Sequence, residues 1–149
     1  MAKVLEGPGM GLMKKWGIPV PNYVVVTSVD ELTKLGQANE WLKKSKLVVK
    51  AHEALGSRFK LGLVKVDLDL KGAEAATKEM VGRQVGSITV SQVIVSEMIP
   101  HKEEYYCAVK STREGTDVLV ANCGGIEVES NWDRVMRLAQ SPARIATCV

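Results

Sequence analysis

Short runs of β-branched and aliphatic residues alternate with polar segments along the chain, and runs of this length are typical of strands. The run at residues 23–27 is almost wholly apolar, which predicts a buried strand. A turn at residues 113–117 separates two later runs, which indicates a hairpin. The predicted strands are residues 23–27, 46–50, 61–67, 91–100, 104–112, 118–121 and 126–128.

Four segments are predicted to be helical. The first, residues 2–15, is expected to be interrupted by Gly7, Pro8 and Gly9. Ser28 is followed three residues later by Glu31, which is a capping box, so a helix is expected to begin at Ser28. The other two helices are predicted at residues 71–83 and 130–139. Mixed helices and strands with hairpins indicate an α+β fold, or an α/β fold with an antiparallel sheet.

Composition narrows the class of protein. The 149 residues suffice for one domain or for two small subdomains that share a core. Hydrophobic residues make up 46%, as in globular proteins, and no apolar run approaches the ~20 residues of a membrane helix. The net charge of +3 is spread along the chain and aromatic residues make up only 5%, which argues against a nucleic-acid-binding module. No secretory signal is visible, so we expect a cytoplasmic protein.

The sulfur and imidazole side chains indicate neither a metal centre nor a nucleophile. The three cysteines lack C-x-x-C spacing and fit reduced, mostly buried thiols, with Cys107 and Cys123 inside apolar strands. The two histidines, His52 and His101, have no partners at metal-ligand spacing. Trp132 is interpreted as a core residue. We therefore predict no metal site and no catalytic residue in this chain.

A lysine and a basic loop are the strongest candidates for chemistry. Lys50 ends a predicted strand, where its ammonium would have a fixed position. The loop at residues 56–62 begins and ends with glycine and carries Arg58 and Lys60, so backbone N–H groups and cations could together bind phosphates. A solvated hairpin whose cations face water explains the same spacing equally well. The Walker A pattern is absent, which excludes a P-loop of that class.

A second candidate lies where the strand at residues 91–100 ends. Glu97, Met98 and Ile99 precede a proline, and the end of the strand would expose backbone groups able to pair with an adenine edge. The carboxylate of Glu104 could accept hydrogen bonds from both hydroxyls of a ribose. Taken alone, a glutamate at such a position is more often part of a solvated turn.

Several motifs, in their order along the chain, resemble the β-subunits of succinyl-CoA synthetases, which are nucleoside-diphosphate-forming acyl-CoA synthetases with an ATP-grasp fold. These motifs are Gly17-Ile18-Pro19-Val20-Pro21, Leu47-Val48-Val49-Lys50, Lys60-Leu61-Gly62-Leu63-Val64 and Gly124-Gly125-Ile126-Glu127-Val128-Glu129. The ATP-citrate lyase branch is favoured by Pro100-His101, Glu103-Glu104-Tyr105-Tyr106, Ser111-Thr112-Arg113-Glu114-Gly115 and Asn131-Trp132-Asp133. The resemblance covers nearly all residues between Leu12 and Leu138.

The resemblance implies an α+β ATP-grasp fold in which two subdomains hold the nucleotide between their sheets. The lid subdomain would span residues 21–99, and residues 1–20 and 100–149 would form an incomplete second subdomain. Lys50 resembles the phosphate-contacting lysine of the family, and Arg58 with Phe59 resembles its loop over the phosphates. The adenine-binding hinge would be Glu97, Met98 and Ile99, and the ribose ligand would be Glu104.

In this family ATP phosphorylates a histidine on another domain or subunit, the phosphohistidine phosphorylates citrate or succinate, and CoA captures the acyl phosphate. The lyase branch then cleaves citryl-CoA to acetyl-CoA and oxaloacetate. The resemblance thus implies ATP, Mg²⁺, citrate and CoA as ligands, and a hetero-oligomer with a partner subunit that carries the phosphohistidine. The ligands of Mg²⁺ and the sites for citrate and CoA are expected outside this chain, which we interpret as a truncated fragment, inactive alone.

One position departs from the family pattern. The family's loop has Arg-Gly-Lys, whereas this chain has Arg58-Phe59-Lys60. A bulky ring where the backbone would approach phosphate favours an alternative, a non-catalytic module that keeps the fold for subunit contacts. A succinyl-CoA synthetase β-like subunit is a further alternative, because the organic-acid site that separates the two enzymes is expected outside this chain.

Overall fold

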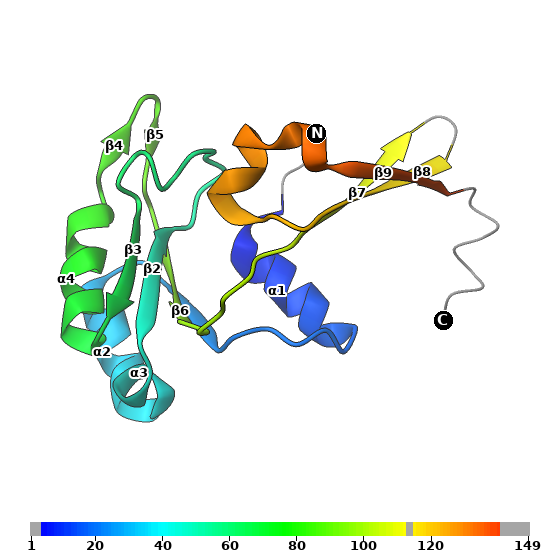
Figure 1. Cartoon of the computed structure of the whole chain (residues 1–149). Helices are drawn as coiled ribbons and strands as arrows, with labels where there is room; N and C mark the ends of the chain where they lie inside the picture. Colours follow the sequence, from blue (N-terminus) through cyan, green and yellow to red (C-terminus); the bar gives the residue numbers. More distant parts are fainter. Residues whose placement is uncertain (1–3, 113–114, 141–149) are drawn as a thin grey trace. The chain divides into compact units, whose positions relative to one another are not determined.

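The computed structural model describes residues 4–112 and 115–140, and the chain forms two compact units, Met1–Ile99 and Pro100–Val149 (Figure 1). Each unit has its own sheets, and the strand pairs in the described residues are antiparallel. Together with the helices, these sheets confirm the predicted α+β fold. None of the helices in these residues has the length and apolarity that a membrane span requires.

The described part of the first unit contains a four-stranded sheet with the strand order β1-β6-β2-β3. Strand β6 lies between β1 and β2, so both of its edges are hydrogen-bonded, and four of its five residues are buried. Each strand falls within a predicted segment or within one residue of it. The bounds are β1 Tyr23–Val26, β2 Leu47–Ala51, β3 Val64–Leu68 and β6 Val93–Glu97.

One face of this sheet forms the core of the unit. On β2 the side chains alternate, and Leu47, Val49 and Ala51 are fully buried in one cluster with Leu32 and Met80 from the covering helices. Figure 1 shows α2 and α4 on the same side of this sheet. The N-cap half of the predicted capping box is confirmed, because the N–H of Glu31 donates to Ser28 Oγ at 3.2 Å. The carboxylate of Glu31 accepts from the N–H of Thr27 at 2.8 Å. The helices that follow β1 in this unit are α2 Val29–Ala38, α3 Trp41–Lys44 and α4 Leu70–Met80.

Helix α1 (Glu6–Lys15) covers the opposite face of the sheet. The hydroxyl of Tyr23 on β1 donates to the carbonyl oxygen of Gly7 at 2.9 Å. The helix continues without a break through Gly7, Pro8 and Gly9, so the predicted interruption is wrong. Pro8 stands in the first turn, where backbone N–H groups have no partner within the helix, and its missing donor therefore removes no helical hydrogen bond.

Helix α1 is part of the first compact unit. The family resemblance implied that residues 1–20 belong with residues 100–149. In the structure the backbone of Gly7 is hydrogen-bonded to Tyr23 and His52, which lie in the first unit. The boundary between the two compact units lies between Ile99 and Pro100. The assignment of residues to the two ATP-grasp subdomains stays a prediction.

A small hairpin after α4 was not predicted. It pairs β4 (Gln84–Val85) with β5 (Ile88–Thr89) across the two residues Gly86 and Ser87. Gly86 has φ of +60°, which tight hairpin turns require at this position. The Gly86-Ser87 pair, a combination typical of tight hairpin turns, was the signal in the sequence.

The second unit contains a three-stranded sheet in the described residues, in the order β7-β8-β9. The predicted hairpin is confirmed, because Thr112 pairs with Gly115; Arg113 and Glu114 in its turn lie outside the described residues. The segment 126–128, predicted as a strand, is part of a 3₁₀ helix. The elements are β7 Tyr106–Thr112, β8 Gly115–Ala121, η1 Gly125–Ser130, η2 Trp132–Arg134 and β9 Met136–Gln140.

The predicted α-helix at residues 130–139 is wrong, because residues 132–134 form a short 3₁₀ helix and residues 136–140 form strand β9. Residues of β9 pair with β8 from Val120 back to Thr116, and Arg137 Nε lies 2.8 Å from Asp117 Oδ2. Asp117 is buried, so this ion pair gives its carboxylate a partner. Pairing with the edge of β8, together with the ion pair to Asp117, thus overrides the weak helical pattern of this segment.

Two side chains differ from their predicted burial. Trp132 is 58% exposed, so it is not a core residue; its ring meets that of Tyr106 edge-on, with centroids 6.2 Å apart. Cys107 is exposed, although Cys123 is buried as predicted. Cys107 lies on the outer strand β7, which has a partner strand on one side in the described sheet. Cys148 lies outside the described residues.

Candidate functional site

Lys50 stands near the end of β2, and its side chain lies on the face of the sheet that α1 covers. The pleat directs Leu47, Val49 and Ala51 into the core, so Lys50 points the other way. Leu47 pairs with Glu97, the last residue of β6. Lys50 lies three residues beyond Leu47, so about 10 Å of strand separates it from the end of β6. The predicted position of this lysine on a buried strand is confirmed.

A carboxylate joins the two cations that the sequence singled out. The Nζ atom of Lys50 lies 2.6 Å from Glu6 Oε1, and Nη2 of Arg58 lies 3.0 Å from Glu6 Oε2. The other terminal nitrogen of Arg58, Nη1, donates to the carbonyl oxygen of Ala51 at 2.9 Å. Lys50 and Arg58 therefore converge on one anion, and the backbone of β2 holds the guanidinium in place.

The electrostatic balance keeps Glu6 ionised. Burial alone would raise the pKa of the Glu6 carboxyl, but the hydrogen bonds and charges of Lys50 and Arg58 outweigh burial and lower that pKa. Glu6 also stands in the first turn of α1, where the helix dipole favours a negative charge. The three side chains together carry a net charge of one positive unit, so the cluster still attracts anions.

His52 fixes the start of α1 against the sheet. Its Nε2 accepts a hydrogen bond of 2.9 Å from the N–H of Gly7, which requires a neutral ring with the proton on Nδ1. Burial lowers the pKa of His52; the charge of Arg58 acts in the same direction, and the carboxylates of Glu6 and Glu53 act against it. Within the described residues Nδ1 is buried without a hydrogen-bond partner.

The loop that follows β2 is ordered by its own backbone. The N–H groups of Leu61, Gly62 and Leu63 donate to carbonyl oxygens of Ser57, Phe59 and Arg58, at distances of 3.2, 3.0 and 2.8 Å. Positive φ angles occur at Ser57 and Gly62, so the conformation of the loop does not require glycine at position 59. The ring of Phe59 is 55% exposed. Beside this loop lies a cavity of about 250 Å³ whose lining includes Glu6, Glu53, Gly56 and Arg58.

The segment predicted to be the adenine hinge lies at the end of β6. The N–H of Glu97 donates to the Asn22 carbonyl oxygen at 2.8 Å, and the N–H of Met98 donates to that of Lys46 at 2.7 Å. The expectation that this strand end exposes its N–H groups is therefore wrong for these two residues, because β6 is flanked on both sides. The carboxylate of Glu97 accepts from Ser45 Oγ at 2.6 Å and from Asn22 Nδ2 at 3.0 Å. Ile99 is 51% exposed.

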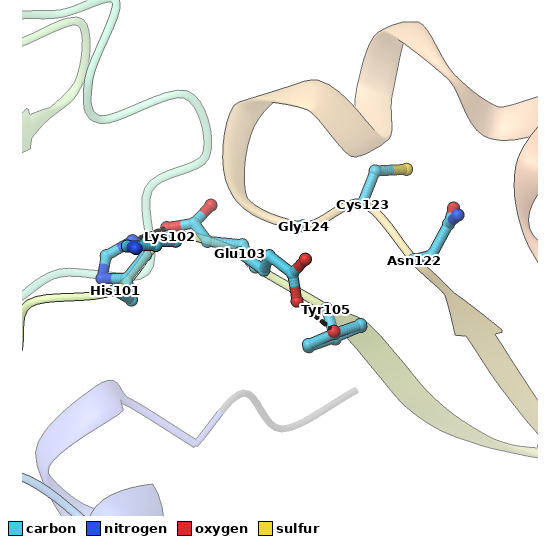
Figure 2. A pocket seen from close by; sticks show the side chains of 8 residues that line it. His101, Lys102, Glu103, Tyr105, Asn122, Cys123 and Gly124 are labelled. Carbon is cyan, nitrogen blue, oxygen red and sulfur yellow. Dashed lines mark hydrogen bonds and ion pairs between the residues drawn. The ribbon is translucent and has the colours of Figure 1, made fainter.

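Glu104 belongs to the second unit and lines a pocket of about 620 Å³ (Figure 2). Its Oε1 lies 2.9 Å from Nε2 of His101, and the neighbouring Tyr105 hydroxyl donates to Glu103 Oε2 at 2.5 Å. Figure 2 shows Asn122, Cys123 and Gly124 entering from the segment after β8, opposite the segment that carries Tyr105. The remaining lining residue is Lys102.

Two glycines make room for Glu104. A Cβ atom at Gly124 would lie 2.8 Å from Glu104 Cβ, and one at Gly125 would lie 2.1 Å from Glu104 Oε2. Gly125 also has φ of +58°, a backbone conformation that side chains disfavour. The Gly-Gly pair, which the sequence offered only as a family motif, thus determines where the Glu104 carboxylate can lie.

Sequence analysis did not predict that Glu6 contacts Lys50 and Arg58, or that His52 lies beside them at the start of α1. Glu6 is 44 residues from Lys50 and 52 from Arg58, so no local spacing links the three. The available signal was a single acidic residue in the first turn of a helix. For metals, no group of three or more His, Cys, Asp or Glu side chains in the described residues could hold an ion.

The antiparallel sheets and the helices that pack on them define an α+β domain. A family model described as an ATP-grasp domain matches residues 3–146. The chain belongs to the ATP-grasp family.

Individual relatives refine this result. The chain is 40% identical over 118 residues to ATP-citrate synthase alpha chain protein 1 of Arabidopsis thaliana, covering 75% of this chain and 27% of that protein. It is 36% identical over 112 residues to human ATP-citrate synthase, covering 71% of this chain and 10% of that protein. The chain therefore spans about a quarter or less of the length of these relatives.

Solved structures agree with the sequence comparison. The structure of ATP citrate lyase from Methanothrix soehngenii, in complex with citrate and coenzyme A, matches with a TM-score of 0.67 and 33% identity, over 81% of this chain and 28% of that one. An acetyl-coenzyme A synthetase from Ca. Korarchaeum cryptofilum matches with a TM-score of 0.73 and 23% identity, over 91% of this chain and 59% of that one. The second likeness concerns the fold alone.

Proposed function

We propose that this chain is the ATP-binding part of an ATP-citrate lyase. The observation that carries the proposal is the convergence of Lys50 and Arg58 on one carboxylate, in a chain of the ATP-grasp family. Two fixed cations that bind a carboxylate are also suited to phosphate oxygens, which have the same charge sign and accept the same hydrogen bonds. The identities of 40% and 36% to ATP-citrate synthases favour citrate over succinate as the acid of the complete enzyme.

The proposed reaction converts ATP, citrate and CoA into ADP, phosphate, acetyl-CoA and oxaloacetate. The γ-phosphoryl group passes to a histidine on another domain or subunit, and that phosphohistidine then phosphorylates citrate. In this reaction the chain supplies positioning and charge, because phosphoryl transfer depends chiefly on both. Lys50 and Arg58 would neutralise the phosphates and orient them for transfer.

The other predicted contacts complete the nucleotide assignment. Glu97, Met98 and Ile99 are proposed to contact adenine; the N–H groups of Glu97 and Met98 are already bonded, so carbonyl oxygens and side chains of this segment would make the contact. Glu104 is proposed to accept hydrogen bonds from the ribose hydroxyls, in the place that Gly124 and Gly125 leave open to it.

The remaining ligands and partners lie outside the described residues in this proposal. No acidic cluster suited to a metal occurs among the described residues, so Mg²⁺ would be held by ligands elsewhere in the assembly. Citrate and CoA would bind to domains that the relatives have beyond the matched part, and the phosphohistidine would come from a partner subunit. We propose that the resulting hetero-oligomer is cytoplasmic.

Titration of the chain with ATP by calorimetry tests the proposal. Lys50→Ala removes a charge-assisted hydrogen bond, so we expect ATP affinity to fall at least about tenfold. Lys65→Ala is the matched control, because Lys65 lies on the neighbouring strand β3 and its ammonium contacts Glu79 at 3.3 Å. Equal affinities for the two variants would refute the role of Lys50.

Phe59 supports one other candidate function, a module that makes subunit contacts without binding nucleotide. Its ring is exposed on the loop that follows β2, where the family has glycine. Phe59→Gly separates the two functions, because the loop conformation does not require either residue. Tighter ATP binding by the variant would indicate a nucleotide site that the ring obstructs, whereas absence of binding by both proteins would favour the module.

The choice between citrate and succinate is tested on the complete protein with its partner subunit. A coupled assay for ADP release, run with either acid and CoA, is expected to respond to citrate. A response to succinate alone would identify a succinyl-CoA synthetase instead.

A further inference from the structure

We propose that Glu6 is a built-in competitor of the nucleotide: its carboxylate occupies Lys50 and Arg58, and polyphosphate must displace it to bind. This inference rests on the proposed nucleotide function of the two cations. It concerns a residue for which neither the sequence motifs nor the comparisons provide a role.

The geometry of the cluster is that of an occupied anion site. Both oxygens of Glu6 are used, one by Lys50 Nζ at 2.6 Å and the other by Arg58 Nη2 at 3.0 Å. All three side chains are about three-quarters buried, so water screens their charges only in part. A phosphate that reached the same nitrogens would meet the carboxylate at a few ångströms, and the two anions repel each other at that distance.

The cations do not depend on Glu6 for their positions. The guanidinium of Arg58 is held separately by the Ala51 carbonyl oxygen at 2.9 Å. Lys50 is fixed by its place on β2, which pairs with β6 on one side and β3 on the other. Removal of the negative charge therefore leaves two positioned cations, whose combined charge rises from one to two positive units.

The contact of Glu6 with Lys50 and Arg58 is also able to open. Glu6 stands at the beginning of α1, next to the described N-terminal residues Val4 and Leu5, and lines the cavity of about 250 Å³ beside the loop. Arg58, Glu53 and Gly56 line the same cavity. Rotation of the Glu6 side chain would thus release the cations without any change in β2.

The experiment measures binding of inorganic tripolyphosphate by calorimetry, because this probe isolates the phosphate contacts from adenine and ribose. Glu6→Gln keeps the size of the side chain and removes its charge, and we expect it to bind at least about fivefold more tightly than the wild type, the effect of two unit charges 4 Å apart even in water. Glu53→Gln is the matched control, since Glu53 lines the same cavity but accepts its hydrogen bonds from Ser91. It is expected to change affinity by less than twofold.

A second measurement uses the wild-type chain and so does not depend on the folding of a variant. The pKa of Glu6, followed by NMR of carboxyl ¹³C in labelled protein, is low in the free chain because of its two cations. Saturation with tripolyphosphate is expected to raise this pKa toward 4.5 or above, since Glu6 then loses its cations. A pKa that stays low in the saturated chain would overturn the proposal.

The outcomes separate this inference from the proposed function. Equal or weaker binding by Glu6→Gln, while Lys50→Ala abolishes binding, would make Glu6 a positioning residue and overturn the inference while the nucleotide function stands. If neither tripolyphosphate nor ATP binds to the wild type or to Glu6→Gln, both the inference and the proposed function are wrong. Tighter binding by Glu6→Gln alone, with Glu53→Gln unchanged and the Glu6 pKa raised by ligand, would establish the competition.

Discussion

The backbone N–H of Gly7 donates a 2.9 Å hydrogen bond to Nε2 of His52, a residue 45 positions further along the chain. Leu5, at the N-cap of α1, provides no side-chain hydrogen bond to the helix. The imidazole of His52 therefore performs the task of an N-cap from another element. Because a protonated imidazole has no acceptor nitrogen, this contact exists only while His52 is neutral.

Stability is expected to fall as the pH drops below about 6.5, because the pKa of His52 is lowered in the folded chain from its ordinary 6.5. The unfolded chain then takes up the proton first, and stability present above pH 6.5 is lost as the pH falls toward the folded pKa. The loss should be about 1 kcal/mol, the usual contribution of an N-cap. Thermal unfolding followed by circular dichroism between pH 5.5 and 7.5 measures it.

His52→Gln keeps a neutral acceptor for the N–H of Gly7 and should flatten this pH dependence. Glu6 and Glu53 contribute at lower pH, because their lowered pKa values make them lose stabilising interactions only below about 4.5. An unchanged slope in His52→Gln would contradict the capping role.

Gly7→Ala is expected to destabilise the chain by about 1 kcal/mol, although alanine favours helices. The new Cβ would lie 3.0 Å from Val25 Cγ2 and 3.1 Å from His52 Nε2, and overpacking of this kind costs about 1–3 kcal/mol. Gly9→Ala in the same helix is the matched control, because nothing lies within 4 Å of its Cβ position. The free energy of unfolding of Gly9→Ala should rise by about 0.5–1 kcal/mol. Urea unfolding of both variants decides, and equal effects would refute the close packing at Gly7.

Gly125→Ala is expected to displace the Glu104 carboxylate and to weaken ATP binding. Its Cβ would lie 2.1 Å from Glu104 Oε2, in addition to the backbone strain of φ +58°. Gly86→Ala provides the control, since Gly86 has φ of +60° but open space around its Cβ position. Strain alone costs about 1 kcal/mol. Calorimetry with ATP should show at least about a threefold loss for Gly125→Ala and none for Gly86→Ala; identical affinities would argue against the ribose role of Glu104.

Trp132→Ala should cost about 1 kcal/mol, the value of an aromatic pair, because Trp132 is exposed and contacts the ring of Tyr106. Truncation of a buried tryptophan would cost about 3–5 kcal/mol. Chemical unfolding of the single variant measures the loss. In a Tyr106→Leu background the same substitution is expected to have a smaller effect, and a loss above 3 kcal/mol would restore the interpretation of Trp132 as a core residue.

Sequence patterns predicted the elements whose stability is local. The apolar runs at β1, β2 and β6 and the Ser28–Glu31 capping box were found because their signals span only a few residues. Lys50 and Arg58 were singled out for the same reason. Glu6 escaped because its partners are 44 and 52 residues away, and only the packing of α1 on the sheet brings them together.

The errors arose where a distant partner decides the structure. The segment at residues 136–140 has a weak helical pattern. It forms a strand because it pairs with the edge of β8 and because Arg137 contacts the buried Asp117. The N–H groups of Glu97 and Met98 were expected to be open because a proline follows, and the flanking strands bond them instead. Continuity of a helix through Pro8 was missed because the position of the proline within the first turn depends on where the helix begins.

The order of strands in the first unit has a consequence for synthesis on the ribosome. Strand β1 pairs with β6, and Tyr23 finds its partner Ser96 only after more than seventy further residues have been added. Until then β1 exposes an apolar edge of the kind that pairs with other nascent chains. Folding of this unit must therefore await nearly its last residue, and versions cut before Val93 lose β6, the strand that joins β1 to β2.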